Sequence, residues 1–169
     1  MAEARITPEV ERPGRVRQVA VSPSARALST LSHIDYEDTF LVDVGPPREL
    51  TAEQWSRAVL EDAPIGVRCT LQSGWAAIGL KLGSEPSERF VLGWAIRRST
   101  REFVLLGADS RIGMAAELLF KRQRSALLCA TFVQKDNHIA QAVWAGVEPV
   151  HVPAVRYVLA QASRRCRPI

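Results

Sequence analysis

The sequence predicts an α+β domain in which a curved antiparallel sheet packs against a long C-terminal helix. Two observations carry this prediction. Most segments with a strand pattern follow one another in a single block, and the helical segments lie outside that block, as in α+β folds with an antiparallel sheet. The last segment is an apolar helix, and a helix in that position usually covers one face of the sheet.

The size and composition of the chain agree with one globular domain. Of its 169 residues, 47% are hydrophobic and 24% are charged, which is enough apolar material for a sizeable core. No run of about 20 apolar residues is present, and the N-terminus lacks the apolar segment of a signal peptide. We therefore expect no membrane span and a cytoplasmic location.

The N-terminal part of the chain is expected to be a flexible arm. Residues 1–32 are polar, charged and interrupted by prolines, and only residues 25–31 have a pattern that allows a helical turn. A single domain is then expected over residues 33–167, and it shows no internal repeats.

The first strand is predicted over residues 34–44, where apolar residues alternate with polar and acidic ones. Asp38 falls on the apolar side of this alternation. Two interpretations are open: Asp38 lies near a strand irregularity, or its carboxylate points into a polar corner of a cavity.

Two shorter helices are predicted after the first strand. Thr51 begins the first of them and can form a capping box with Gln54. Pro64 suits the N1 position of the second helix, whose apolar residues recur at three- and four-residue steps. Gly83 is expected to cap the C-terminus of this second helix.

The other strands are predicted where apolar residues alternate between turn residues, at 90–97, 102–108, 114–122, 126–133 and 139–147. The last two flank a polar hairpin loop at residues 134–138. Pro153 is then expected at the N1 position of the last helix.

Four segments in the second half of the chain carry a resemblance to a known superfamily. They are a strand and turn at 104–111 (VLLGADSR), a strand at 130–133 (ATFV), a turn at 136–139 (DNHI) and the start of the last helix at 147–151 (VEPVH). In this order they resemble the START-like helix-grip superfamily (SRPBCC, Bet v 1-like), and locally a bacterial group of unknown function within it. The resemblance covers roughly residues 34–165 and leaves the N-terminal arm unmatched.

The resemblance implies a helix-grip fold, in which a bent antiparallel sheet wraps around the C-terminal helix and can enclose a hydrophobic cavity. It implies no reaction. After the Gly-Ala-Asp turn the relatives tend to carry His-Leu-Asp, where this chain has Ile112, Gly113 and Met114, and they tend to carry Phe in place of Val150. Some relatives are attached to NAD-binding domains, but this chain has no G-x-G-x-x-G element, so we expect no cofactor.

Three residues are candidates for acid–base chemistry. His151 is predicted at the start of the last helix, where its imidazole could bind a ligand or move a proton; alternatively, it caps the helix or bonds a backbone carbonyl. Glu117 lies on an apolar strand face and would need a buried partner there, unless a bulge turns it to water. Asp38 is the third candidate. The possible partners of Glu117 are Arg97, Arg111 and His151.

The four tryptophans are candidates for lining a ligand cavity, because an indole ring offers a large apolar area and one hydrogen-bond donor. The alternative is that they are ordinary core residues. The predicted ligand-binding set is Trp55, Trp75, Trp94, Glu117, Trp144 and His151.

The sequence lacks the motifs of common hydrolytic, metal-dependent and phosphoryl-transfer sites. It contains no G-x-S-x-G, no H-E-x-x-H, no Cys/His zinc array and no P-loop. Cys69, Cys129 and Cys166 have no metal-ligand spacing, and Cys129 is expected to be a buried thiol. We therefore expect no bound metal.

The net charge of +4 does not predict nucleic-acid binding. The basic residues cluster at 97–101, 121–124 and 164–167, which are predicted strand ends and the C-terminus. A nucleic-acid-binding domain usually concentrates its cations on one face. We therefore expect no nucleic-acid partner.

Three functions agree with these patterns. The first, which we favour, is the binding of a small hydrophobic ligand between the sheet and the C-terminal helix, without catalysis. The second is an enzyme of the cyclase, aromatase or dehydratase type that uses the same pocket, with His151 and either Glu117 or Asp38 as its acid–base groups. The third is a homodimeric interaction or regulatory module that binds no small molecule.

Overall fold

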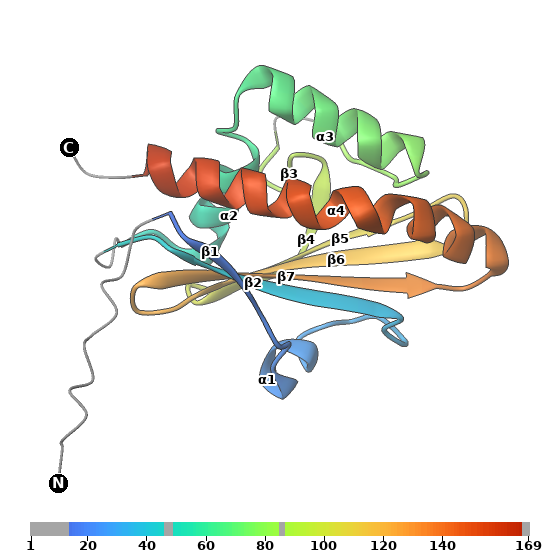
Figure 1. Ribbon diagram of the computed structural model, residues 1–169, viewed down its shortest axis with the longest axis horizontal. Coiled ribbons are helices and arrows are strands. Elements are labelled where there is room, and N and C mark those ends of the chain that lie inside the picture. The colour runs from blue at the N-terminus through green and yellow to red at the C-terminus, as the bar shows by residue number, and fades with distance from the viewer. Residues whose placement is uncertain (1–13, 46–48, 85–86, 167–169) are drawn as a thin grey trace, which may run out of the picture.

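The computed structural model describes residues 14–45, 49–84 and 87–166. It confirms the predicted fold class: a curved, seven-stranded antiparallel sheet is covered on one face by the long helix α4 (His138–Arg165) (Figure 1). The other helices are α1 (Pro23–Arg26), α2 (Ala52–Leu60) and α3 (Ile65–Ala77). In Figure 1, α2 and α3 lie on the same side of the sheet as α4, and α1 lies on the opposite side.

The sheet is built largely from successive hairpins. Its strands are β1 (Val16–Val19), β2 (Tyr36–Asp43), β3 (Phe90–Val91), β4 (Trp94–Ser99), β5 (Phe103–Asp109), β6 (Met114–Arg122) and β7 (Ala126–Lys135). They lie in the order β1-β2-β7-β6-β5-β4-β3, with every neighbouring pair antiparallel. Strands β2 and β7, which lie far apart in the sequence, are therefore neighbours in the sheet.

Both faces of the central strands are buried, each in a different core. The larger core lies between the sheet and the helices α2, α3 and α4. The smaller core lies on the opposite face, beneath the segment that contains α1; it comprises Ala25, Leu105, Leu119, Leu128, Ala130 and Phe132. Alternation along each strand sends successive side chains to these two cores.

The expectation of a flexible arm is wrong for residues 14–32, whereas residues 1–13 lie outside the described residues. β1 pairs with β2, and α1 is capped by the Ser22 hydroxyl, which accepts from Ala25 N at 3.1 Å. Ala25 is fully buried in the smaller core. The strand pattern was missed because β1 is an edge strand of four half-exposed or exposed residues, so it carries no apolar alternation.

The predicted strand at 139–147 is also wrong, because these residues form the first part of α4. Asn137 caps the helix through its side-chain oxygen, which accepts from Ala140 N at 2.9 Å. Pro153 therefore does not open the helix; Pro149 and Pro153 both lie inside it and are exposed. Because their rings point to solvent, the carbonyl groups that lose an N–H partner can bind water.

The predicted capping box of Thr51 and Gln54 is present at the start of α2. By contrast, α3 ends at Ala77, and Gly79 at φ +80° leads the chain out of it, so Gly83 is not its cap. The predicted strand at 90–97 is divided into β3 and β4 by a two-residue turn, Leu92-Gly93, with φ values of 46° and 90°. Both residues adopt positive φ, as in the turns that suit right-twisted hairpins.

Candidate functional site

A cavity of about 430 Å³ lies between the sheet and the helices α3 and α4. This volume is in the range of small-molecule sites. Its floor consists of alternate residues of β6 and β7: Met114, Ala116, Leu118, Phe120, Cys129, Thr131 and Val133. Helices α3 and α4 supply its roof, mainly with Leu71, Trp75, Ile78, Trp144, Val147, His151 and Val155.

Small side chains in the middle of the sheet leave this space open. Ala108 and Ala116 are cross-strand partners, and Ala116 also pairs with Val133 of β7. The same row continues to the large side chain of Tyr36 on β2. Methyl groups at the centre of the row cannot reach the helix layer, so the layers are held apart by the larger residues around them.

Helix α3 presents its apolar stripe to the cavity. Leu71, Trp75 and Ile78 line the space, as the three- and four-residue spacing predicts for one face, yet none of the residues of α3 is buried. Apolar side chains on the inner face of a helix are usually buried by packing. Here they border a cavity, so a ligand would complete the burial of this helix.

His151 and Asp38 meet at the wall of the cavity. Nε2 of His151 lies 3.0 Å from Oδ2 of Asp38, and the hydroxyl of Tyr36 donates to the same oxygen at 2.8 Å. The side chains of His151 and Asp38 are 14% and 1% exposed. An ionised carboxylate only accepts hydrogen bonds, so opposite an ionised Asp38 the Nε2 of His151 is the donor, and Nδ1 takes no part in the contact.

Aromatic rings hold this pair in place. The ring of Trp144 lies 4.8 Å from Tyr36 and 5.3 Å from His151, centroid to centroid. Burial, together with the hydrogen bond to Asp38, raises the pKa of Tyr36 well above its ordinary value. Tyr36 therefore remains a neutral donor, and it keeps the Asp38 carboxylate oriented for His151.

Several buried polar atoms beside the cavity make no hydrogen bond within the described part of the chain. They are Oδ1 of Asp38, Oγ1 of Thr131 and Nε1 of both Trp94 and Trp144. Thr131, Trp94 and Trp144 line the cavity, and Thr131 is the cross-strand partner of Asp38. A buried polar group without a partner costs about 1–3 kcal/mol, so native proteins contain few of them.

Glu117 does not enter the cavity, and its pairing with His151 is ruled out. It is fully buried on the opposite face of the sheet, where it accepts from the Ser29 hydroxyl at 2.6 Å and from the hydroxyl and N–H of Thr30. Arg97 completes the site with Nη1 3.5 Å from the carboxylate. Of the two alternatives that the sequence left open, the structure has the inward one, with Arg97 as the charged partner, and the core that Glu117 faces is the smaller one.

The tryptophans divide into two groups. Trp75, Trp94 and Trp144 line the cavity, and the rings of Trp75 and Trp94 meet edge-on with centroids 5.4 Å apart. Trp55 is buried in the larger core but does not line the cavity.

Two residues of the site, Tyr36 and Thr131, were not among the predicted ones. Tyr36 lies two positions before Asp38 and so shares its strand face. Thr131 is a hydroxyl side chain on the inward face of the apolar strand β7. Asp38 was predicted as a candidate because it is a polar residue at an inward position of an apolar strand. The same criterion, applied to residues 126–133, predicts Thr131 as well.

Cys129 lies on the cavity floor as a fully buried thiol, and burial raises its pKa, with a further contribution from the charge of Asp38. Iodoacetamide at about pH 8 is therefore expected to modify the exposed Cys69 at least about 100-fold faster than Cys129 in the folded protein. Peptide mapping by mass spectrometry measures both rates, and unfolding in urea should equalise them. Equal rates in the folded protein would contradict the buried position of Cys129.

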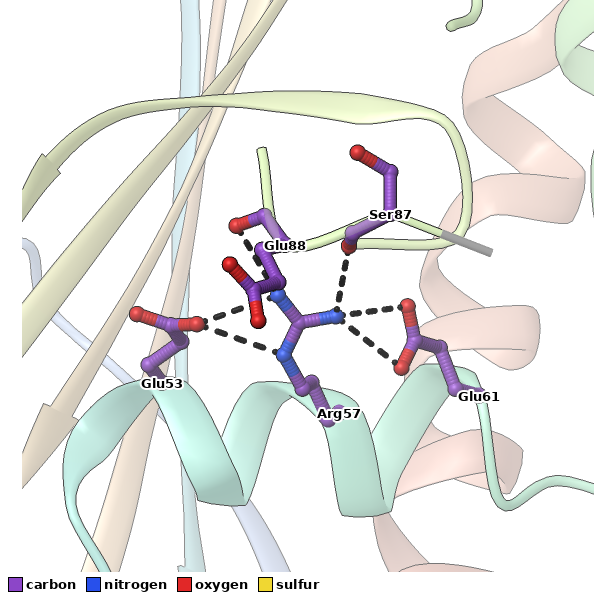
Figure 2. A pocket seen from close by; sticks show the side chains of 5 residues that line it. All are labelled: Glu53, Arg57, Glu61, Ser87 and Glu88. Carbon is purple, nitrogen blue, oxygen red and sulfur yellow. Dashed lines mark hydrogen bonds and ion pairs between the residues drawn. The ribbon is translucent and has the colours of Figure 1, made fainter. Parts of the chain in front are cut away.

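A second hollow, on the surface beside α2, is occupied by the side chain of Arg57 (Figure 2). Its Nη2 and Nη1 each lie 3.0 Å from a carboxylate, those of Glu53 and Glu61 respectively. The guanidinium also donates to the backbone carbonyls of Ser87, Glu88 and Phe90. These bonds attach the segment before β3 to α2, so this hollow is a structural clamp.

Replacing Arg57 by lysine is expected to lower the free energy of unfolding by about 1–2 kcal/mol, because an ammonium group cannot reproduce the planar fork that reaches both carboxylates and the carbonyls. Urea unfolding measures the change. Arg89→Lys, at an exposed position on the same segment, is the matched control and should change stability by less than about 0.5 kcal/mol. Equal effects of the two substitutions would show that Arg57 is not a clamp.

Within the described residues, no group of three or more His, Cys, Asp or Glu side chains is placed to hold a metal ion. None of the helices in this part of the chain is both long and apolar enough to cross a membrane.

A scan of protein-family models finds none that matches this chain, and a search of curated proteins finds no match either.

Proposed function

We propose that this protein binds a small, mostly apolar molecule in the cavity between the sheet and helices α3 and α4. The observation that carries the proposal is the cavity itself: about 430 Å³, lined mainly by apolar and aromatic side chains. Small-molecule sites combine such a lining with a few placed polar groups. The resemblance to START-like helix-grip proteins supports the same position for the ligand.

Two further features support binding. Buried polar atoms of Thr131, Trp94 and Trp144 lack partners among the described residues, and a ligand could supply those partners. The inner face of α3 also remains incompletely buried. A bound molecule would satisfy both the polar atoms and the apolar stripe.

The test is to identify what the purified protein carries. The full chain is purified without detergent, measured by native mass spectrometry, then denatured and extracted for analysis of small molecules. We expect a stoichiometric mass increment in the native spectrum and one apolar compound in the extract. A native mass equal to that of the bare chain, together with no binding of added apolar probes, would contradict the proposal.

A second candidate function is acid–base catalysis of the cyclase, aromatase or dehydratase type in the same cavity. The 3.0 Å contact between His151 and Asp38 favours it, because a carboxylate that orients an imidazole leaves the other ring nitrogen free to accept a proton. Asp38, rather than Glu117, would be the partner of His151.

Catalysis is tested on the compound recovered from the protein and on its close analogues. Conversion by the wild-type chain that is lost in His151→Gln, with binding retained, would support an enzyme. Recovery of every compound unchanged after incubation with the wild-type chain would favour binding alone.

A further inference from the structure

We infer that the ligand is an uncharged apolar molecule with a hydroxyl group at one end, bound beside Asp38 and Thr131, and an accepting oxygen at the other end, bound by Trp94. This inference rests on the proposed function and assigns a chemical class to the ligand. Each part of it follows from the four buried polar atoms beside the cavity, those of Asp38, Thr131, Trp94 and Trp144, which have no hydrogen-bond partner in the described chain.

The hydroxyl end follows from the chemistry of Asp38 and Thr131. They are cross-strand partners, and their side chains leave the same face of the sheet, so they lie within about 5.5 Å at Cβ. Oδ1 of an ionised Asp38 can only accept, whereas the Thr131 hydroxyl can donate or accept. A single ligand hydroxyl can donate to Asp38 and accept from Thr131, so it satisfies both atoms.

The position of Trp144 adds to this end of the cavity. Its ring contacts Tyr36 and His151, which are the other two neighbours of Asp38. Its Nε1–H is a donor only. A hydroxyl oxygen has two lone pairs and can therefore accept from Trp144 as well as from Thr131.

The accepting end follows from Trp94. Trp94 lies on β4, and β5 and β6 separate that strand from β7, so it is three strand spacings of ~4.8 Å from Thr131 across the sheet. Its indole N–H can only donate. A carbonyl or ether oxygen of the ligand can accept from this N–H. An apolar ring system between that oxygen and the hydroxyl would span the separation between Trp94 and Thr131.

The charge of the lining excludes acids. No Lys, Arg, Asp or Glu lines the cavity among the described residues, and the one imidazole in the lining, that of His151, is already paired with the Asp38 carboxylate. A carboxylate or phosphate would lose its hydration without gaining a cation. Fatty acids and phosphorylated molecules are therefore poor ligands, despite the apolar walls.

Matched naphthalene probes test the inference by titration of the full chain, with tryptophan fluorescence as the readout. We expect 2-naphthol to bind about tenfold more tightly than naphthalene, and 6-hydroxy-2-acetonaphthone about tenfold more tightly than 2-naphthol. We expect 2-naphthoate to bind more weakly than 2-naphthol.

Two variants locate the polar contacts. Thr131→Val should remove most of the preference for 2-naphthol over naphthalene without changing the affinity for naphthalene. Trp94→Phe should remove the gain from the acetyl group. The matched control is Thr39→Val, since the Thr39 hydroxyl is equally buried and lacks a partner in the described chain but belongs to a residue that does not line the cavity.

The outcomes separate this inference from the proposed function. Equal binding of naphthalene and 2-naphthol to the wild-type chain would overturn the inference and leave the cavity as an apolar site. An unchanged preference in Thr131→Val, or tight binding of 2-naphthoate, would overturn it too. Failure of every probe to bind, with native mass spectrometry showing a bare chain, would overturn the proposed function itself.

Discussion

Replacing Glu117 by alanine is expected to lower the free energy of unfolding by about 3–5 kcal/mol, because removing one partner of a buried ion pair leaves the other groups unpaired. Glu117 is 0% exposed, and its carboxylate is the shared acceptor of Ser29, Thr30 and Arg97. Without it, two hydroxyls and a backbone N–H lose their buried acceptor, and the Arg97 guanidinium keeps only its contacts with Thr30 and the exposed Asp109. Urea unfolding, with both the midpoint and the slope fitted, measures the loss.

The path of the Arg97 side chain to Glu117 requires a glycine on the strand between them. Arg97 extends from β4 over Gly107 of β5 to reach Glu117 on β6. A Cβ atom at Gly107 would lie 1.9 Å from Nε of Arg97, so only glycine lets the side chain cross the strand at this height. The carboxylate thereby links its own strand β6, and β4 through Arg97, to the N-terminal segment at residues 29–30.

Asp109→Asn is the control for the Glu117 substitution. Asp109 also binds Arg97, at 3.1 Å, but its side chain is 69% exposed. An exposed ion pair contributes about 0–1 kcal/mol, so this change should cost little. If Glu117→Ala cost no more than Asp109→Asn, the buried carboxylate would not be what holds the N-terminal segment to the sheet.

Replacing Ala116 by phenylalanine is expected to weaken the binding of an apolar fluorescent probe, N-phenyl-1-naphthylamine, by about 30–100-fold. Ala116 lies on the floor of the cavity, where a phenyl ring would occupy the space of the probe. A loss of about 2–3 kcal/mol of apolar burial corresponds to this change in affinity. Titration of the probe by fluorescence measures it.

Stability provides a second readout for the same variant. In a filled core, an extra ring costs about 1–3 kcal/mol by overpacking, whereas a ring that enters a cavity should change the free energy of unfolding by less than about 1 kcal/mol. Ala115→Phe places the same ring one residue earlier on β6, on the opposite face, and should leave probe binding unchanged. Equal probe affinity in wild type and Ala116→Phe would show that the probe binds elsewhere.

Much of the fold could be predicted because its signals are local. The alternation over residues 34–44 and the Thr51–Gln54 capping box each depend on a few neighbouring residues, and the structure has both. The segment at 139–147 shows the limit of such signals. Its Ile, Val and Trp residues suit a strand, but the Asn137 cap and the burial of Ala140 and Trp144, four residues apart, belong to a helix.

The candidate site was predicted in part. His151 and Asp38 were both singled out from their own surroundings, and the structure places them 3.0 Å apart although 113 residues separate them in the chain. Glu117 was singled out in the same way but faces the other core. Strand β6 is buried on both faces, so its alternation shows that Glu117 and Ala116 point in opposite directions without showing which of them meets the cavity.

The sequence by itself determined that this protein is an α+β domain with an antiparallel sheet and a long C-terminal helix, because strand alternation, helical spacing and capping depend on residues close together in the chain. Only the tertiary structure decided which face of the sheet borders the cavity. It also decided that residues 14–32 pair with the sheet and pack against it, rather than forming a flexible arm, and that Asp38 is the partner of His151. These depend on contacts between distant segments, and two opposite faces of one strand look alike until the elements that cover them are in place.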